Sequence, residues 1–257
     1  MGKIQKSFLF FRAMFSKSAR IRFRMVLHFS RCFTEPFVIS FAQGAEDLAL
    51  LQAFNNMRDG KYIDVGAHNP HRFSVTRILY EKGWTGVNIE ANDEVAPLFE
   101  KYRKKDVNLF FAVGTQETYN FYKFSEPALN STNEDWVSNH LNKNLVREMI
   151  TIKGITLKTV IDTYFKNSRC NLLKIDIEGS DLDALKSIDF ENLDTSKYPE
   201  WILLETVPPV EKSLSYESIQ FAINYGYEPY VVLPTVYLIE IEIGSTINCN
   251  LLFERRL

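Results

Sequence analysis

Two carboxylates stand where neighbouring strands of an open sheet are expected to end. The stretch KYIDVGAHNP (residues 61–70) reads as a short buried strand that reaches Asp64 just before a tight turn at Gly66. Glu90 ends the next expected strand, GVNIE. Ligands of open α/β sheets bind at the carboxyl ends of the strands, and an acid at the second strand end commonly holds ribose hydroxyls. The pattern therefore predicts a site for a ribose-bearing ligand.

The same turn is a poor match for a nicotinamide dinucleotide. That ligand requires G-x-G-x-x-G at the start of a helix, so that the backbone can cradle a pyrophosphate. The three glycine places here hold Asp64, Gly66 and Asn69, and an acid would face a phosphate. A ligand with a ribose, no phosphate and a positive charge near Asp64 fits better. S-adenosylmethionine (SAM) joins an adenosine, an amino acid and a sulfonium, and it has this chemistry.

Strands and helices alternate around these residues. Strands are expected over 61–65, 86–90, 108–113, 172–177 and 201–205, with helices over 46–54, 75–82, 95–103 and 181–188. This alternation predicts an α/β fold with a parallel sheet and right-handed crossovers. A period-two stretch over 117–124 and a β-prone stretch over 148–157 predict an antiparallel insertion between residues 115 and 160. Short strands over 227–233, 235–243 and 250–254 predict antiparallel C-terminal edge strands.

The segment 66–92, GAHNPHRFSVTRILYEKGWTGVNIEAN, resembles the signature region of the FkbM family of SAM-dependent methyltransferases. That family shows a D-[VI]-G-A turn, then Pro, Ser and Thr, then G-W-x-G and a strand ending in I-E. Four further stretches resemble it in the same order: AQGAEDLAL (42–50), RKKDVNLFFAVG (103–114), LLKIDIEGSDLDAL (172–185) and WILLE (201–205). Val75 departs from the asparagine common at its place, and Ala42 and Ala45 replace a serine and a glycine.

The resemblance implies a Rossmann-like methyltransferase fold. Its sheet would have seven strands, mostly parallel, with the last strand antiparallel and inserted beside its predecessor. The implied cofactor-binding positions are Asp64, Gly66, Ala67, Glu90, Ala112 and Val113. The first three would shape the pocket for the amino acid half of SAM, the glutamate would take the ribose, and the backbone near the last two would border the adenine.

The stretch KIDIEG (174–179) resembles the family's catalytic segment. Asp176 is expected at the fourth strand end, facing the sulfonium, and Glu178 two residues later could face the same cleft. Either carboxylate could accept the proton of a substrate hydroxyl, a kind of help worth about 10²–10⁴ in rate. Glu178 could instead complement the N-terminus of the following helix. His68 stands where the family often has histidine or asparagine, and it could line the pocket or act as the base.

Glu205, at the end of the next strand, could complete an acidic pocket with Asp176 and Glu178. Carboxylate oxygens are the ligands that Mg²⁺ and Mn²⁺ prefer, so a divalent metal is an open alternative to a general base. The spacing of these acids alone assigns no metal ligands.

Residues 1–34 carry eight lysines and arginines and no acid, whereas the whole chain has a net charge of −2. Their apolar and basic residues fall on different sides of a helix, which predicts a basic amphipathic extension over 1–39 before a methyltransferase domain over 40–257. The extension could contact a membrane surface peripherally or pack on its own domain. The acidic remainder of the chain makes nucleic acid a disfavoured partner.

Three widely spaced cysteines form no disulfide or metal pattern, and no apolar run is long enough for a transmembrane helix. These features predict a cytoplasmic protein. The sequence as a whole predicts a SAM-dependent methyltransferase that O-methylates a hydroxyl of a sugar, glycan precursor or small metabolite. Two alternatives stay open: an RNA-binding or RNA-modifying protein that uses the basic arm, and a catalytically silent SAM-fold interaction module.

Overall fold

The computed structural model describes residues 24–25, 39–54, 57–140, 146–206, 215–234 and 249–255 of the chain. The chain divides into two units, Met1–Ser40 and Phe41–Leu257. In the first, strands β1 (Arg24–Met25) and β2 (Ile39–Ser40) pair antiparallel. Arg24–Met25 fall within the amphipathic helix predicted over 1–34 and form a strand instead, so the prediction is wrong there; the rest of that stretch lies outside the described residues. None of the described helices is long and apolar enough to cross a membrane.

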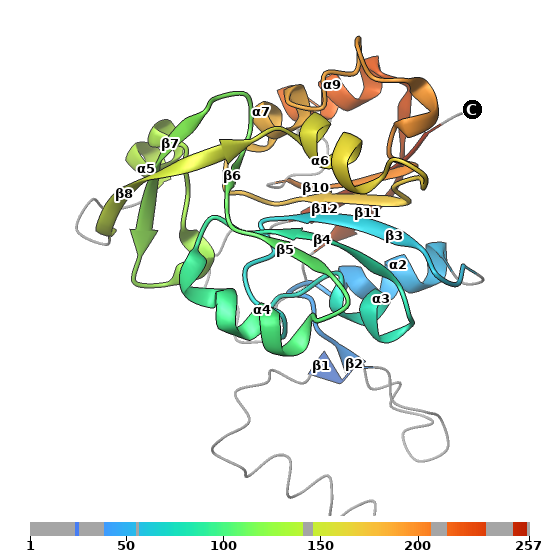
Figure 1. The fold of residues 1–257 in the computed structure, drawn as a ribbon, viewed down its shortest axis with the longest axis horizontal. Coiled ribbons are helices and arrows are strands. Elements are labelled where there is room, and N and C mark those ends of the chain that lie inside the picture. Colours follow the sequence, from blue (N-terminus) through green and yellow to red (C-terminus); the bar gives the residue numbers. More distant parts are fainter. Residues whose placement is uncertain are drawn as a thin grey trace, which may run out of the picture. The chain divides into compact units, whose positions relative to one another are not determined.

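Among the described residues of the second unit, seven strands form the central sheet (Figure 1). Their order is β11 (Tyr227–Pro234), β12 (Cys249–Arg255), β10 (Trp201–Thr206), β9 (Leu172–Ile175), β3 (Lys61–Val65), β4 (Thr85–Ile89) and β5 (Val107–Leu109). Neighbours from β10 to β5 pair in parallel, whereas β12 pairs antiparallel with both β10 and β11. The predicted mostly parallel sheet, with its last strand inserted antiparallel beside its predecessor, is confirmed. The stretch 235–243, predicted as a strand, lies outside the described residues.

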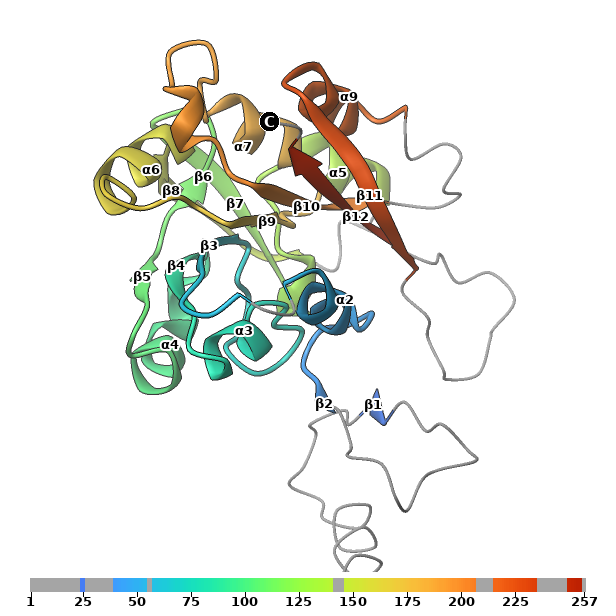
Figure 2. The same ribbon diagram turned by 90° about the vertical axis from the view of Figure 1, so that its right-hand side faces the viewer.

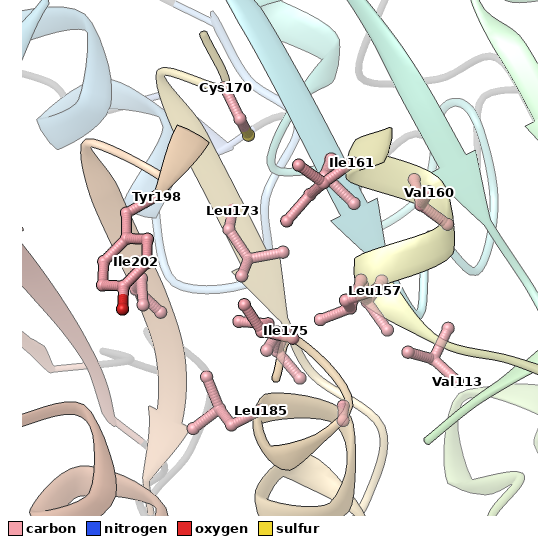
Figure 3. Packing of buried hydrophobic residues seen from close by; sticks show 14 of the residues in the cluster. Val113, Leu157, Val160, Ile161, Cys170, Leu173, Ile175, Leu185, Tyr198 and Ile202 are labelled. Atoms are coloured by element: carbon pink, nitrogen blue, oxygen red, sulfur yellow. The ribbon is translucent and has the colours of Figure 1, made fainter. Parts of the chain in front are cut away.

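One face of this sheet carries the larger of two apolar clusters. The helices that cover it are α6 (Leu157–Tyr164), α7 (Asp181–Lys186) and α9 (Glu217–Asn224) (Figure 2). Helix α6 buries Leu157, Val160 and Ile161 at helical spacing, and Leu157 and Ile161 lie toward Leu173 and Ile175 of β9 (Figure 3). Fully burying a side chain of this size contributes ~1.5–3 kcal/mol. Packing on this face therefore holds β9 at the centre of the sheet.

The opposite face is covered by α2 (Glu46–Ala53), α3 (Arg77–Glu81) and α4 (Ala96–Tyr102) (Figure 1). Successive residues of a strand point to opposite faces, so β3 contributes to both clusters. Ile63 and Val65 join the cluster under α6, whereas Tyr62 joins the cluster under α2 and α3. The same alternation places Asp64 on the face of Tyr62, which decides its contacts below.

Helix boundaries differ from the predicted ones by a few residues. The helices predicted over 75–82 and 95–103 are α3 and a 3-10 turn, η1 (Asp93–Val95), continued by α4. Gly83 follows α3 with a φ of 101°, a left-handed conformation in which glycine is unstrained. Helix α6 was not predicted, because β-prone residues lead directly into it.

The strand predicted over 108–113 is wrong as a single element. Strand β5 ends at Leu109, and β6 (Ala112–Val113) belongs to a separate three-stranded sheet. In that sheet β8 (Val146–Ile155) pairs in parallel with β6 and antiparallel with β7 (Thr118–Phe124). The predicted antiparallel insertion is therefore confirmed. Its sheet also includes residues 112–113, which were predicted as the end of the third strand. Periodicity within 108–113 cannot reveal this, because β8 lies more than 30 residues further along the chain.

Candidate active site

A cleft opens at the carboxyl ends of β3, β4 and β9, with a narrow inner part and a wide outer part of about 1250 Å³. Seven of the nine predicted site residues line the narrow part: Gly66, His68, Glu90, Ala112, Val113, Asp176 and Glu178. Asp64 and Ala67 are not among the lining residues and lie buried behind them. The strand ends thus bring together the expected ribose acid, the expected adenine border and both candidate catalytic carboxylates.

The turn after β3 is held close to the ends of both neighbouring strands. The backbone N–H groups of Gly66 and Ala67 donate to the carbonyl of Ile89 at 3.0 and 3.2 Å. Gly66 has a φ of 71°, and a Cβ at this position would lie 1.9 Å from the carbonyl oxygen of Asp176. Glycine is required here because two segments of backbone meet, which adds a second reason to the ligand approach expected from the sequence.

Glu90 connects the loops that follow β3 and β4. Its carboxylate accepts hydrogen bonds from the backbone N–H of His68 at 2.7 Å and of Asn92 at 2.8 Å. Burial raises the pKa of Glu90, and these two donors partly oppose the rise. An ionised carboxylate has about four acceptor sites, so Glu90 can also accept a ligand hydroxyl from the narrow part of the cleft.

Asp64 is buried behind the turn at Gly66. It is 1% exposed, and its Oδ2 accepts a hydrogen bond of 2.6 Å from Thr76 Oγ1. Its Oδ1 lies 3.4 Å from Lys174 Nζ. Asp64 therefore shapes the cleft through Lys174 and the turn above it, without facing the ligand.

Lys174 is a site residue that the sequence reasoning missed. Its Nζ donates to the carbonyl oxygens of Gly66 at 2.8 Å and Val65 at 3.3 Å, and it lies 3.5 Å from Asp176 Oδ2. Burial alone would lower the pKa of Lys174, but Asp176 and Asp64 outweigh burial and raise it. The sequence contains one signal that could have identified it: a lysine within the apolar run LLKI. A charge in a buried strand requires partners, and these are found only at a polar site.

Three carboxylates converge where β9 and β10 end. Oxygens of Asp176, Glu178 and Glu205 all lie within 4.8 Å of one another. Burial and the neighbouring Asp176 raise the pKa of Glu178 to about 8 and that of Glu205 well above its usual range. Burial and Asp176 also raise the pKa of Asp181 to about 6. At neutral pH the group therefore retains protons, and Glu178 becomes able to accept a proton from a substrate as the pH approaches 8.

The turn that carries Glu178 is tied to the insertion. Glu178 has a φ of 50°, a left-handed conformation that costs a non-glycine residue about 1–2 kcal/mol. Ser131 Oγ donates to the carbonyl of Glu178 at 2.8 Å, and Asn133 Nδ2 donates to the carbonyl of Gly179 at 2.7 Å. These bonds stabilise the strained turn, so Ser131 and Asn133 position residues 178–179.

Two acids other than Glu178 complement the N-terminus of α7. Asp181 and Asp183 occupy its first turn, and Glu178 precedes the N-cap residue Ser180. Glu178 lines both parts of the cleft. Its position therefore agrees with the catalytic interpretation better than with the helix-end interpretation.

His68 is a weak candidate for the base. Burial, with the charges of Arg72 and Lys174, lowers the pKa of His68 to about 4. Arg72 Nη1 lies 3.3 Å from His68 Nε2 and also pairs with Glu126 at 2.7 Å. A general base works best with a pKa near the operating pH, so Glu178 suits the task better and His68 is neutral in the cleft wall.

The order of the central sheet and the acids at its strand ends define a Rossmann-like methyltransferase fold. Residues 64–234 match the family described as the methyltransferase FkbM domain. The chain therefore belongs to this family of SAM-dependent methyltransferases, as its motifs predicted. No curated protein matches the chain.

Solved structures resemble the chain at low sequence identity. A human methyltransferase 10 domain containing protein is 11% identical with a TM-score of 0.45, and the match covers 81% of each chain. A candidate RNA methyltransferase from Pyrococcus horikoshii is 9% identical with a TM-score of 0.44, covering 83% of each chain. The precorrin-6y C5,15-methyltransferase from Geobacter metallireducens is 10% identical with a TM-score of 0.42, covering 82% of this chain and 86% of that one. Similarities this distant carry no argument about substrate.

Proposed function

We propose that the protein transfers a methyl group from SAM to a hydroxyl of a sugar, glycan precursor or small metabolite. One observation carries this proposal: Glu90 at the end of β4 and Asp176 beyond the end of β9 line the same narrow cavity, on either side of the Gly66 turn. An acid for ribose and an acid for a cationic centre are the two polar features that SAM requires. A pyrophosphate would meet carboxylates at both places.

The residues that line the narrow part of the cleft suggest how SAM would bind there. Glu90 would accept the ribose hydroxyls, and the backbone of Ala112 and Val113 would border the adenine. Asp176 would face the positively charged part of the ligand. Bound SAM supplies an electrophilic methyl group on a sulfonium.

The acceptor hydroxyl would enter from the wide part of the cleft, which also includes Trp136 and Asn133 of the insertion. Glu178 would accept its proton as the oxygen attacks the methyl carbon. Positioning the two reactants can supply roughly 7–11 kcal/mol of the barrier, more than the base itself. The tethered turn of residues 178–180 would provide such positioning.

An uncharged acceptor suits the charge of the wide part. Nine carboxylates and three lysine or arginine side chains line it. Such a surface repels phosphates and disfavours RNA as the substrate. A polyhydroxylated acceptor can hydrogen-bond to the same carboxylates without that cost.

Calorimetric titration with SAM tests the cofactor assignment. We expect wild-type protein to bind SAM and Glu90→Ala to lose binding, because the variant lacks both the ribose acceptor and the bridge between two loops. Glu100→Ala, at an exposed position of α4, is the matched control and should bind normally. Unchanged affinity in Glu90→Ala would remove Glu90 from the site.

Turnover with methyl-labelled SAM tests the acceptor class. The purified protein would be incubated with a cell extract, and the labelled product would be separated into small molecules, glycans, RNA and protein. Label on a hydroxyl of a small molecule or glycan supports the proposal. Label confined to RNA would refute it, and SAM binding without any labelled product would favour the silent module.

A further inference from the structure

Lys174 is a buried cation beneath the proposed methyl-transfer site, and the proposed function leaves it without a role. The side chain is 5% exposed and its Nζ contacts two backbone carbonyls and two carboxylates at 2.8–3.5 Å. A buried ammonium is costly unless it is paired and hydrogen-bonded, and these four oxygen contacts meet both requirements. The contacts point both to the turn that shapes the cofactor pocket and to the carboxylate that faces it.

The charge of Lys174 is supported from behind by a buried polar network. Arg103 is fully buried, pairs with Asp106 at 2.8 Å and donates to Thr76 Oγ1 at 2.8 Å. Thr76 passes a 2.6 Å hydrogen bond on to Asp64, whose other oxygen faces Lys174. The contacts therefore run from the Asp106–Arg103 pair through Thr76 to Asp64. Asp64 in turn is a counter-charge for Lys174 beneath the cleft.

We propose that Lys174 is a positioning residue of the methyl-transfer site: its ammonium holds the Gly66 carbonyl and lies between Asp64 and Asp176, where its charge lets the cleft keep negative charge toward a cationic ligand. This inference rests on the proposed function, because it takes the cationic ligand to be SAM. Without Lys174, three mutually close carboxylates would relieve their repulsion by binding protons. The cleft would then attract a sulfonium less strongly.

The charged and titratable groups around Lys174 come from every neighbouring element of the cleft. They are Asp64 of β3, His68 of the following turn, Glu90 after β4, Asp176, Glu178 and Asp181 after β9, Glu205 of β10, and Glu46 of α2, which interacts with Asp176. Lys174 lowers the pKa of Glu178 and Asp181 against the stronger effect of burial. A close opposite charge lowers a carboxyl pKa by about 1–3 units, and the low end of that range applies here because Lys174 is the weakest of the influences on Glu178 and Asp181. The pH at which the cleft becomes competent should therefore move upward when Lys174 loses its charge.

The test is calorimetric SAM titration of the full chain from pH 5.5 to 9, with Lys174→Met and Lys174→Arg. We expect Lys174→Met to weaken binding at pH 7 by about tenfold or more and to move the binding midpoint upward by about one pH unit, following the effect of a neighbouring charge. Lys174→Arg retains the charge and should keep the wild-type midpoint. Lys82→Met, at an exposed position after α3, is the matched control and should change neither quantity.

A second variant gives a shift of opposite sign and covers the case in which Lys174→Met does not fold. Asp64→Asn removes a negative charge from the other side of Lys174, so the midpoint should move downward. A merely structural role would weaken both variants without opposite shifts. A folded Lys174→Met with the wild-type midpoint, or Asp64→Asn shifted upward, would overturn the proposal.

Carboxyl ¹³C NMR titration reads the same charge effect without SAM. The cleft carboxyls should titrate at higher pH in Lys174→Met than in the wild type. Failure of wild-type protein to bind SAM at any pH would refute the proposed function, while this titration would still decide the electrostatic role of Lys174. Identical carboxyl titrations in the two proteins would overturn that role.

Discussion

Replacing Glu178 with glutamine gives the sharpest test of the site, because one substitution has separate consequences for stability and for turnover. The substitution keeps the shape of the side chain and removes its ability to ionise. Burial and Asp176 raise the pKa of Glu178 from 4.5 to about 8. The folded protein therefore holds a proton that the unfolded chain releases at lower pH.

The sign follows from proton binding. Below pH 4.5 both states hold the proton, and the buried neutral carboxyl does not oppose folding. Between about pH 4.5 and 8 only the folded state holds it, so the free energy of unfolding falls by about 1.4 kcal/mol per pH unit. Over the whole window the fall is on the order of 5 kcal/mol. Glutamine cannot titrate, so the variant should gain stability relative to the wild type as the pH rises.

Urea unfolding at pH 5, 6.5 and 8 measures this, with the fluorescence of the buried Trp84 as one probe. Loss of the Glu178 charge also removes one cause of the raised pKa of Glu205, so the difference between the two pH profiles reports Glu178 together with its effect on Glu205. Glu100→Gln is the exposed control and should follow the wild-type profile. Parallel profiles for Glu178→Gln and wild type would show that Glu178 is ionised in the folded state and would refute the electrostatic argument.

The same variant tests the base. SAM affinity should be retained at neutral pH, because Glu178 already holds its proton there and glutamine resembles that neutral form, whereas turnover should fall by about 10²–10⁴. Wild-type turnover should rise with pH up to about 8, as Glu178 loses its proton. Turnover that survives the substitution would leave Glu178 with a role in the turn only.

Three further outcomes follow from the contacts. Gly66→Ala should lose about 2–5 kcal/mol in urea unfolding, since its Cβ would meet the Asp176 carbonyl at 1.9 Å. Gly226→Ala is its control, with a φ of 87° and no atom within 4 Å of the added Cβ, and it should lose only about 1–2 kcal/mol. Turnover should persist in EDTA, because Lys174 and retained protons already offset the acidic cluster; loss that Mg²⁺ restores would assign a metal to Asp176, Glu178 and Glu205. The full chain should float with vesicles containing phosphatidylserine at low salt and lose this on deletion of residues 1–39; equal flotation of both proteins would exclude a membrane role for the arm.

Much of the fold could be predicted because it depends on local signals. Neighbouring residues alone predict the strand over 61–65, the glycine turn after it and the alternation of strands and helices. Parallel strands end at one edge of a sheet, so Glu90 and Asp176 could be expected to meet without any coordinates. The family motifs agreed with the predicted parallel sheet, and the sheet order confirms it. Glu90 and Asp176 line the same part of the cleft.

The insertion shows where local signals stop. Residues 108–113 have one continuous β-prone pattern, but Leu109 ends a strand of the main sheet and Ala112 begins a strand of another. Which partner a strand pairs with depends on segments far away in the chain. The same limit hides the bond from Ser131 to the turn at Glu178, which joins residues 47 apart.

The sequence alone determined which chemical groups gather at the strand ends, because their order along the chain sets which strand each one follows. Only the tertiary structure decided what those groups can do. Asp64 faces Lys174, 110 positions away, and not the ligand, because strand alternation and packing under α3 turn it inward. Glu178 holds its proton near neutral pH because burial and Asp176 act on it together, and both are properties of distance and solvent access that no linear pattern contains.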